Sequence, residues 1–299
     1  MSTLQTFDAL RDRVSAGDRL SDTEVTALAL TPDILPIGML ADAARQQLSG
    51  SRVTYLRVAS YPCDHDIADV VPLAAREVRI VGAPASLEAA LTAVERTQVV
   101  AEDRVVSGFS WSDVVRLAAS DGMAVAQLLA ALRSAGLDAL LEVPLDAVGE
   151  PDPVVEGLAG AGFRQVRLTV HGAPAARRTA LMLRAASLQA RYGCIQSLSP
   201  LPTALQPFRP TTGYDDVRSV AVARLAAPNI PMIQVDWMRY GPKLAQVALT
   251  FGADDLDGAS SATDQPDGPR RAPIEELRRN IVAAGLTPAE RDGRFNVIA

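Results

Sequence analysis

The stretch "MIQVDWMRYGPKLAQVALTFGADDLDG", Met232 to Gly258, decides the fold class. It begins with the short apolar run "MIQVDWM", continues into a helical pattern from Pro242 to Phe251, and passes through a Gly-Ala turn into a weaker apolar run that starts at Ala253. A strand, a helix and a second strand joined by short connections predict two parallel strands with the helix packed on one face.

The same alternation extends through the chain on the N-terminal side of this unit. Helical segments are predicted at 86–96, 112–120, 124–135, 174–192 and 215–227. Strand-like runs lie between them: "VTYLRVA" at Val53, "EVRIVGA" at Glu77, "RVVSGFS" at Arg104, "DALLEVPLDAV" at Asp138, "RQVRLTVHG" at Arg164 and "CIQSLSPL" at Cys194. About eight such units in one chain favour closure into a (β/α) TIM-type barrel, an α/β fold.

Helices are predicted on both flanks of this barrel. Residues 1–50 read as an N-terminal helical cover, in which Ser21 and Glu24 form a capping box and Thr31-Pro32 supplies a cap and a first-turn proline. Residues 51–299 read as the barrel with a C-terminal extension, in which the loop-like "SSATDQPDGPRRAP" precedes a last helix from Pro273 to Ala284. We expect one compact domain.

Composition excludes several classes of protein. The chain has 299 residues, 48% of them hydrophobic, enough for one large core. A net charge of -6 argues against a nucleic-acid partner, and the sequence has neither a signal-peptide pattern nor a membrane-length apolar run, so we expect a cytoplasmic protein. Cys63 and Cys194 stand alone, without the spacing of a metal site, so we expect reduced thiols, no metal and no cofactor.

Functional residues in such a barrel lie in the loops after the carboxyl ends of the strands. The predicted catalytic residues are His171, Asp254 and Asp255. The predicted substrate-binding residues are Arg209, Thr211, Thr212, Trp237, Arg239 and Asp257.

Each of these residues also has a structural interpretation. His171 fits a hydrogen-bonded rim histidine as well as an acid or base. Trp237 fits either interior packing or stacking on a ligand, and the aspartates fit either the rim of a cavity or the start of a helix.

Three longer stretches carry a resemblance to a known family. They are "TTGYDDVRSVAVARL" from Thr211, "NIPMIQVDWMRYGPKLAQVALTFGADDLDG" and "AAGLTPAERDGRFNVI", with "GDRLSDTEVTALALTPDILPIGMLADAARQQ" and "LRSAGLDAL" adding weaker support. The chain resembles aminofutalosine synthase and related radical S-adenosylmethionine enzymes of the futalosine route to menaquinone, including the related cyclase and the deazaflavin-cofactor synthases. The resemblance implies a barrel around a cavity for an aromatic carboxylate or a nucleoside-like molecule, with the acids of "GADDLDG" at its rim. For such a ligand we expect Trp237 to stack on the ring and Arg209 or Arg239 to bind a carboxylate.

The chain departs from this family where the cofactor binds. Members carry CxxxCxxC after the first strand, because three thiolates hold a four-iron cluster, whereas this region reads "VTYLRVASYPCDHDIADVV" with Cys63 alone. The glycine pair after the second strand is reduced to Gly82. After the fourth strand Glu142, Val143 and Pro144 stand where the family has small residues, and Asp146 stands at the position of the family's acid. After the fifth strand Ala173 stands where the family has a histidine. We therefore expect no adenosyl-radical chemistry.

Two functions remain open at this stage. The first is a degenerate barrel, linked to menaquinone biosynthesis, that binds the small ligand or a partner synthase, as a homodimer or in a complex with a cluster-bearing relative. The second is an enzyme with a non-radical acid/base reaction in the same cavity, which needs a group within hydrogen-bond reach of its substrate.

Overall fold

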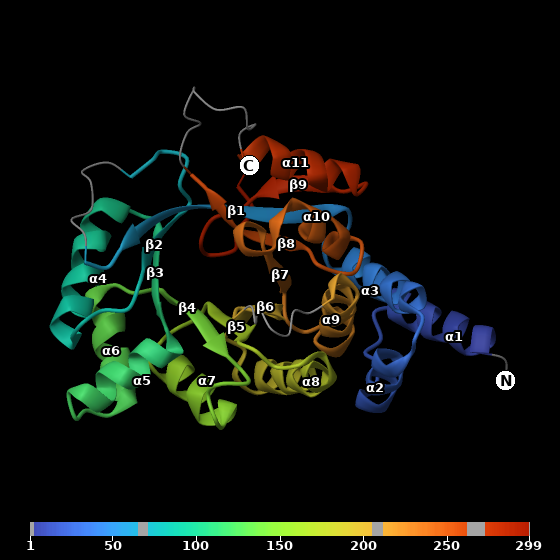
Figure 1. The fold of residues 1–299 in the computed structure, drawn as a ribbon, viewed down its shortest axis with the longest axis horizontal. Helices are drawn as coiled ribbons and strands as arrows, with labels where there is room; N and C mark the ends of the chain where they lie inside the picture. The colour runs from blue at the N-terminus through green and yellow to red at the C-terminus, as the bar shows by residue number, and fades with distance from the viewer. Residues whose placement is uncertain (1–2, 65–70, 205–211, 262–272, 299) are drawn as a thin grey trace.

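The computed structural model describes residues 3–64, 71–204, 212–261 and 273–298. Within these ranges eight parallel strands form a closed barrel surrounded by helices (Figure 1). The strands are β1 (Arg52–Pro62), β2 (Glu77–Val81), β3 (Val105–Ser110), β4 (Ala139–Pro144), β5 (Val166–Val170), β6 (Ile195–Pro202), β7 (Met232–Asp236) and β8 (Asp255–Ser260). The predicted fold is confirmed.

Closure depends on the long strand β1, which pairs with three strands. Its second half, Val58 to Pro62, runs beside β2, and its middle runs beside β8, so the first and last barrel strands meet. Its first half, Arg52 to Tyr55, pairs with a short ninth strand, β9 (Thr287–Glu290), which the sequence patterns did not indicate. β9 therefore fixes the C-terminal tail at the amino end of the barrel.

Helices follow the predicted pattern with local differences. They are α1 (Thr3–Ser15), α2 (Asp22–Leu30), α3 (Ile34–Ser49), α4 (Leu87–Ala101), α5 (Trp111–Ser120), α6 (Val125–Ala135), α7 (Pro151–Gly160), α8 (Ala175–Tyr192), α9 (Gly213–Ala226), α10 (Trp237–Leu249) and α11 (Pro273–Ala283). The predicted capping box of Ser21 and Glu24 is confirmed, but the cap of α3 is Asp33 rather than Thr31. α7 was not predicted, and its sequence "PDPVVEGLAG" is unusually rich in proline and glycine for a helix.

α10 begins five residues earlier than predicted. Gly241 interrupts it with a non-helical backbone, φ 74 and ψ 169, and Pro242 starts its second part. Proline suits that position because the first helical N–H has no partner within the helix. The short first turn directly follows β7 and so places its residues at the carboxyl end of the barrel.

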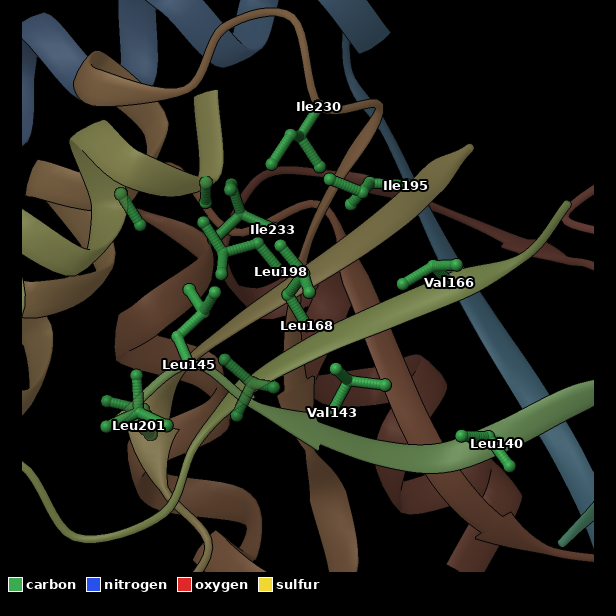
Figure 2. Close-up of a cluster of buried hydrophobic side chains, with 14 of the residues drawn as sticks. Leu140, Val143, Leu145, Val166, Leu168, Ile195, Leu198, Leu201, Ile230 and Ile233 are labelled. Carbon is green, nitrogen blue, oxygen red and sulfur yellow. The ribbon is translucent and has the colours of Figure 1, made fainter. Parts of the chain in front are cut away.

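Apolar side chains fill the space between the strands and the outer helices. Val166 and Leu168 of β5 and Ile233 of β7 belong to one such cluster (Figure 2), and all are 3% exposed or less. Successive side chains of a strand point to opposite faces, so the residues between them point into the barrel. Those intervening residues are largely polar, and they build the site.

None of the helices in the described residues is by itself long and apolar enough to cross a membrane, although the bent pair of α5 and α6 reaches that length and composition together.

Candidate functional site

A cavity of about 280 Å³ lies at the carboxyl ends of the strands. This is the end at which barrel proteins of this architecture place their functional residues. The residues that line the cavity come from seven strands and the first turn of α10. Its polar lining residues are Ser60, Arg79, Glu142, Thr169, Ser199, Thr203, Gln234, Asp236, Arg239, Tyr240 and Asp257.

The floor of the cavity is an ion pair between Arg79 and Asp257. Arg79 Nη2 donates to Asp257 Oδ1 at 3.0 Å and to Glu77 Oε1, one layer deeper, at 2.8 Å. Burial opposes ionisation of Asp257, but the charges of Arg79 and Arg167 outweigh it and hold the pKa of that carboxyl below its usual range. Asp257 therefore faces the cavity as a fixed carboxylate.

A second group of charges lies on the wall. Arg239 Nη2 donates to Glu142 Oε1 at 3.0 Å, and the backbone N–H of Arg239 donates to Asp236 Oδ1 at 2.8 Å, which makes Asp236 the N-cap of α10. Burial raises the pKa of Asp236, and the negative charge of Asp257 raises it further. Both effects favour the protonated form of Asp236 relative to that of an ordinary aspartate.

The backbone conformation and the space beside Asp236 both favour glycine at position 258. Its φ of +80 favours glycine, and a Cβ at this position would lie 3.3 Å from Asp236 Oδ1. The glycine of "GADDLDG" that follows the last acid therefore keeps one side of the cavity open.

Neutral hydrogen-bonding groups complete the lining. Gln234 Nε2 donates to Asp255 Oδ2 at 2.7 Å, and Ser199 Oγ donates to Gln234 Oε1 at 3.3 Å. The hydroxyl of Tyr240 donates to the carbonyl of Pro202, and burial raises its pKa. The cavity is therefore walled by hydroxyls, one amide and three carboxylates.

Below the cavity a charged layer closes the amino end of the barrel. Arg291, from the tail after β9, donates through Nε and Nη2 to the two oxygens of Asp255 at 2.6 and 2.8 Å. Arg167 donates to both oxygens of Glu77 at 2.9 and 2.6 Å. The ring of Phe295 lies 4.1 Å from the guanidinium carbon of Arg291. The tail thus seals the barrel and supports the cavity floor.

The structure brings together only some of the residues predicted from sequence. Asp257 and Arg239 line the cavity, while Asp255 lies directly beneath it and forms an ion pair with Arg291. Asp254 is outside the cavity: it is buried, lies 2.6 Å from Arg224 Nη2, and accepts hydrogen bonds from Ser49 Oγ and the N–H of Ile233. Burial raises its pKa, although Arg224 partly offsets this.

Three other predicted residues do not line the cavity. His171 is exposed on the rim, in a loop whose backbone N–H groups at 171, 172 and 173 donate to the carboxylate of Asp146. Trp237 is 4% exposed and packs in the hydrophobic core. Thr212 is the N-cap of α9. Arg209 and Thr211 lie outside the described residues.

Several cavity residues were missed by sequence reasoning, chiefly Arg79, Glu142, Asp236 and Tyr240. A signal was available in the strands, where polar residues stand two apart: Glu77 and Arg79, Arg167 and Thr169, Gln234 and Asp236, Asp255 and Asp257. In a strand covered by helices, such spacing indicates a polar barrel interior.

The cysteines do not fit a cluster held by three thiolates. Cys63 follows β1 at the carboxyl end of the barrel, and Cys194 precedes β6 at the amino end, where it is buried. Burial raises the pKa of both thiols, which disfavours the thiolate that iron requires. Across the described ranges, no three His, Cys, Asp or Glu side chains are grouped so as to hold a metal ion.

Comparison with known sequences points to one group of enzymes. The family model described as the CofH/MqnC C-terminal region matches residues 203–298. The chain is 29% identical over 244 residues to a 5-amino-6-(D-ribitylamino)uracil–L-tyrosine 4-hydroxyphenyl transferase of Archaeoglobus fulgidus, covering 72% of this chain and 71% of the relative. It is 38% identical over 96 residues to the aminodeoxyfutalosine synthase of Thermus thermophilus, covering 29% of this chain and 25% of the relative.

Solved structures show the same fold. Methylornithine synthase superposes with a TM-score of 0.66 at 16% identity, covering 94% of this chain and 97% of that one. The FeFe-hydrogenase maturase HydG from Carboxydothermus hydrogenoformans superposes with a TM-score of 0.66 at 12% identity, covering 95% of this chain and 79% of that one.

Proposed function

We propose, from the premise that this chain resembles the radical S-adenosylmethionine enzymes of the futalosine pathway, that it is a degenerate member of that group. In this proposal it binds a small nucleoside-like ligand in the barrel cavity without radical chemistry and serves menaquinone biosynthesis. The supporting observation is the cavity itself, which is framed by carboxylates, hydroxyls and an amide on the face where a ligand would enter.

Charge pairing favours a nucleoside-like ligand over an aromatic carboxylate. Both cavity arginines already face acids, Arg79 with Asp257 and Arg239 with Glu142. A carboxylate ligand at Arg79 would compete with Asp257 and leave that buried acid without its partner, which is costly. At Arg239 it would compete with Glu142, which is partly exposed. Sugar hydroxyls, in contrast, donate to carboxylates and leave the ion pairs intact. Tyr240, rather than the buried Trp237, is the aromatic ring on the cavity wall.

The loss of radical chemistry is part of the proposal and rests on the donor set. A four-iron cluster of this group needs three thiolates in one loop, and the chain has two cysteines placed at opposite ends of the barrel. Neighbouring carboxylates such as Asp64 do not supply the missing sulfur ligands.

Calorimetry with adenosine, inosine and benzoate tests the ligand class. We expect heat of binding with a nucleoside and at least about tenfold weaker binding after Asp257→Asn, because a buried polar contact is lost. Asp121→Asn, a change of an exposed residue, is the matched control. Benzoate binding that is tighter than that of either nucleoside and is lost in Thr203→Trp, which fills the barrel cavity, would favour the aromatic carboxylate. No heat with either nucleoside, together with benzoate heat that is absent or unaffected by Thr203→Trp, would refute ligand binding in the cavity.

An acid/base enzyme is the second proposal, and Asp236 is the observation that favours it. Burial and the neighbouring Asp257 raise its pKa, so it could hold a proton in the cavity and donate it to a bound substrate. This reaction would be established by turnover of a bound nucleoside whose rate falls as the pH rises and Asp236 loses its proton, and which is lost in Asp236→Asn. Binding without turnover would leave the ligand-binding proposal.

A protein partner remains a separate proposal. Leu35 and Met39 on α3 and Val247 on α10 are 65%, 54% and 45% exposed, and a protein partner would bury them. They suit a homodimer or a complex with a cluster-bearing relative. A strict monomer in light scattering at micromolar concentration, with no such relative co-purified from the native host, would exclude both.

A further inference from the structure

A second pocket, of about 260 Å³, lies outside the barrel between α2, α8 and α9. These helices pack on one another in the lower right of Figure 1. The pocket shares no lining residue with the barrel cavity. Its walls are apolar in part, with Ala29, Leu30, Met182 and Val222 among them.

Arg178 is the polar centre of this outer pocket. Its side chain is 2% exposed and lines the pocket, donating through Nε to the carbonyl of Ala173 at 3.0 Å and through Nη1 to Ser219 Oγ at 3.0 Å. Its contact with Asp216 Oδ1 is long, at 3.4 Å, and Nη2 has no hydrogen-bond partner in the described part of the chain. A buried donor without a hydrogen bond destabilises the folded protein, and an acceptor that binds it would remove that cost.

Two neighbouring features make the pocket more favourable to an anion. α8 starts at its edge, and the N-cap residue Pro174 has no side chain to accept from the first backbone N–H groups. Arg218 also lines the pocket, and its guanidinium donates to the backbone carbonyls of Ala29, Thr31 and Pro32, which leave its positive charge in place.

The acids of the pocket are already engaged. Asp215, which lines the pocket, accepts a hydrogen bond from the hydroxyl of Thr212 at 2.8 Å. Asp216, which does not line it, forms an ion pair with Nη1 of Arg178 at 3.4 Å. Because Arg178 lines the pocket beside the apolar wall residues, a carboxylate that contacts its guanidinium would place its apolar part against the wall. Leu30, which is 78% exposed, would gain burial from such a ligand.

We propose that the outer pocket binds a small organic carboxylate with a compact apolar body, held by Arg178. A planar guanidinium suits a carboxylate, and the apolar wall distinguishes this ligand from an inorganic anion. The pocket is independent of the barrel cavity, so its occupancy does not depend on the function proposed above.

Calorimetric titration with benzoate, benzyl alcohol and inorganic phosphate tests the proposal. We expect benzoate to bind, and benzyl alcohol and phosphate each to bind at least about tenfold more weakly, since one lacks the charge and the other the apolar body. Equal binding of benzyl alcohol or phosphate would overturn the chemistry proposed for the pocket.

Variants locate the binding. Arg178→Met should weaken benzoate at least about tenfold, whereas Arg177→Met, a change of the exposed neighbour on the same helix, should leave it unchanged. Thr179→Trp fills the outer pocket and should abolish binding, which keeps the proposal testable if Arg178→Met does not fold. Thr203→Trp, in the barrel cavity, should have no effect. Binding that survives Thr179→Trp, or that disappears with Thr203→Trp, would overturn the proposal, as would the absence of benzoate binding to the unmodified protein.

Discussion

Glu77 is the shared counter-ion of two arginines in the barrel interior, Arg79 and Arg167, and replacing it with glutamine should destabilise the fold. Its carboxylate is fully buried and accepts from Arg167 at 2.9 and 2.6 Å, from Arg79 at 2.8 Å and from Ser107 at 2.6 Å. Glutamine preserves the shape but removes the charge. Two buried guanidinium groups would then lose their shared counter-ion.

The expected loss is about 3–5 kcal/mol of unfolding free energy, the usual cost of removing one partner from a buried ion pair. Urea unfolding followed by circular dichroism measures it, with an unchanged m-value as the sign that only stability has changed. Glu95→Gln on the surface of α4 is the matched control and should stay within about 0.5 kcal/mol. A loss below about 1 kcal/mol for Glu77→Gln would refute the view that the interior network depends on this carboxylate.

Two further measurements sharpen the test. Because the charges of Arg167 and Arg79 outweigh burial, they hold the pKa of Glu77 below its usual range. A carboxyl whose pKa is lower in the folded state stabilises the fold above its unfolded pKa, about 4.3, and this stabilisation disappears as the pH falls toward the folded pKa. Glu77→Gln should remove that part of the acid dependence. Adding Arg167→Met should restore part of the lost stability, since the double variant removes opposite charges together.

Three other outcomes are expected. Gly293→Ala should lower the free energy of unfolding in urea by about 1–3 kcal/mol, because its Cβ would lie 2.5 Å from Val105 Cβ at the sealed end of the barrel. The control Gly157→Ala in α7 should leave the unfolding free energy unchanged, and equal stability of the two variants would contradict this packing. Carbon-detected NMR should find the pKa of Asp236 above that of an ordinary aspartate and lower after Asp257→Asn, which removes the like charge; a pKa unchanged by that variant would assign the shift to burial alone. Anaerobic treatment with iron and sulfide should leave the protein without a cluster, and stoichiometric iron with cluster absorption would overturn the proposed loss of radical chemistry.

The barrel could be predicted because its signals are local. Apolar runs bounded by turn residues predicted seven strands. The capping box at Ser21 and the helical pattern that begins at residue 86 located the starts of α2 and α4 to within a residue. β8 gave a weaker signal because three of its six residues, Asp255, Asp257 and Gly258, are poor strand formers, and the tertiary contacts with Arg79 and Arg291 override that preference.

Sequence by itself also associated the acids after Gly252 with the last strand and showed that two thiols are too few for a site of three thiolates. The expected position after the carboxyl end of that strand is wrong, because Asp254 directly precedes β8 and Asp255 and Asp257 lie within it. Only the tertiary structure decided their roles. Asp254, Asp255 and Asp257 are adjacent in sequence, yet they face respectively Arg224 outside the cavity, Arg291 beneath it and Arg79 at its floor. Alternation of side chains turns Asp254 away from Asp255 and Asp257, which share the inner face but lie in successive layers. Each arginine comes from a different, distant element, so no local pattern can reveal which acid meets which charge.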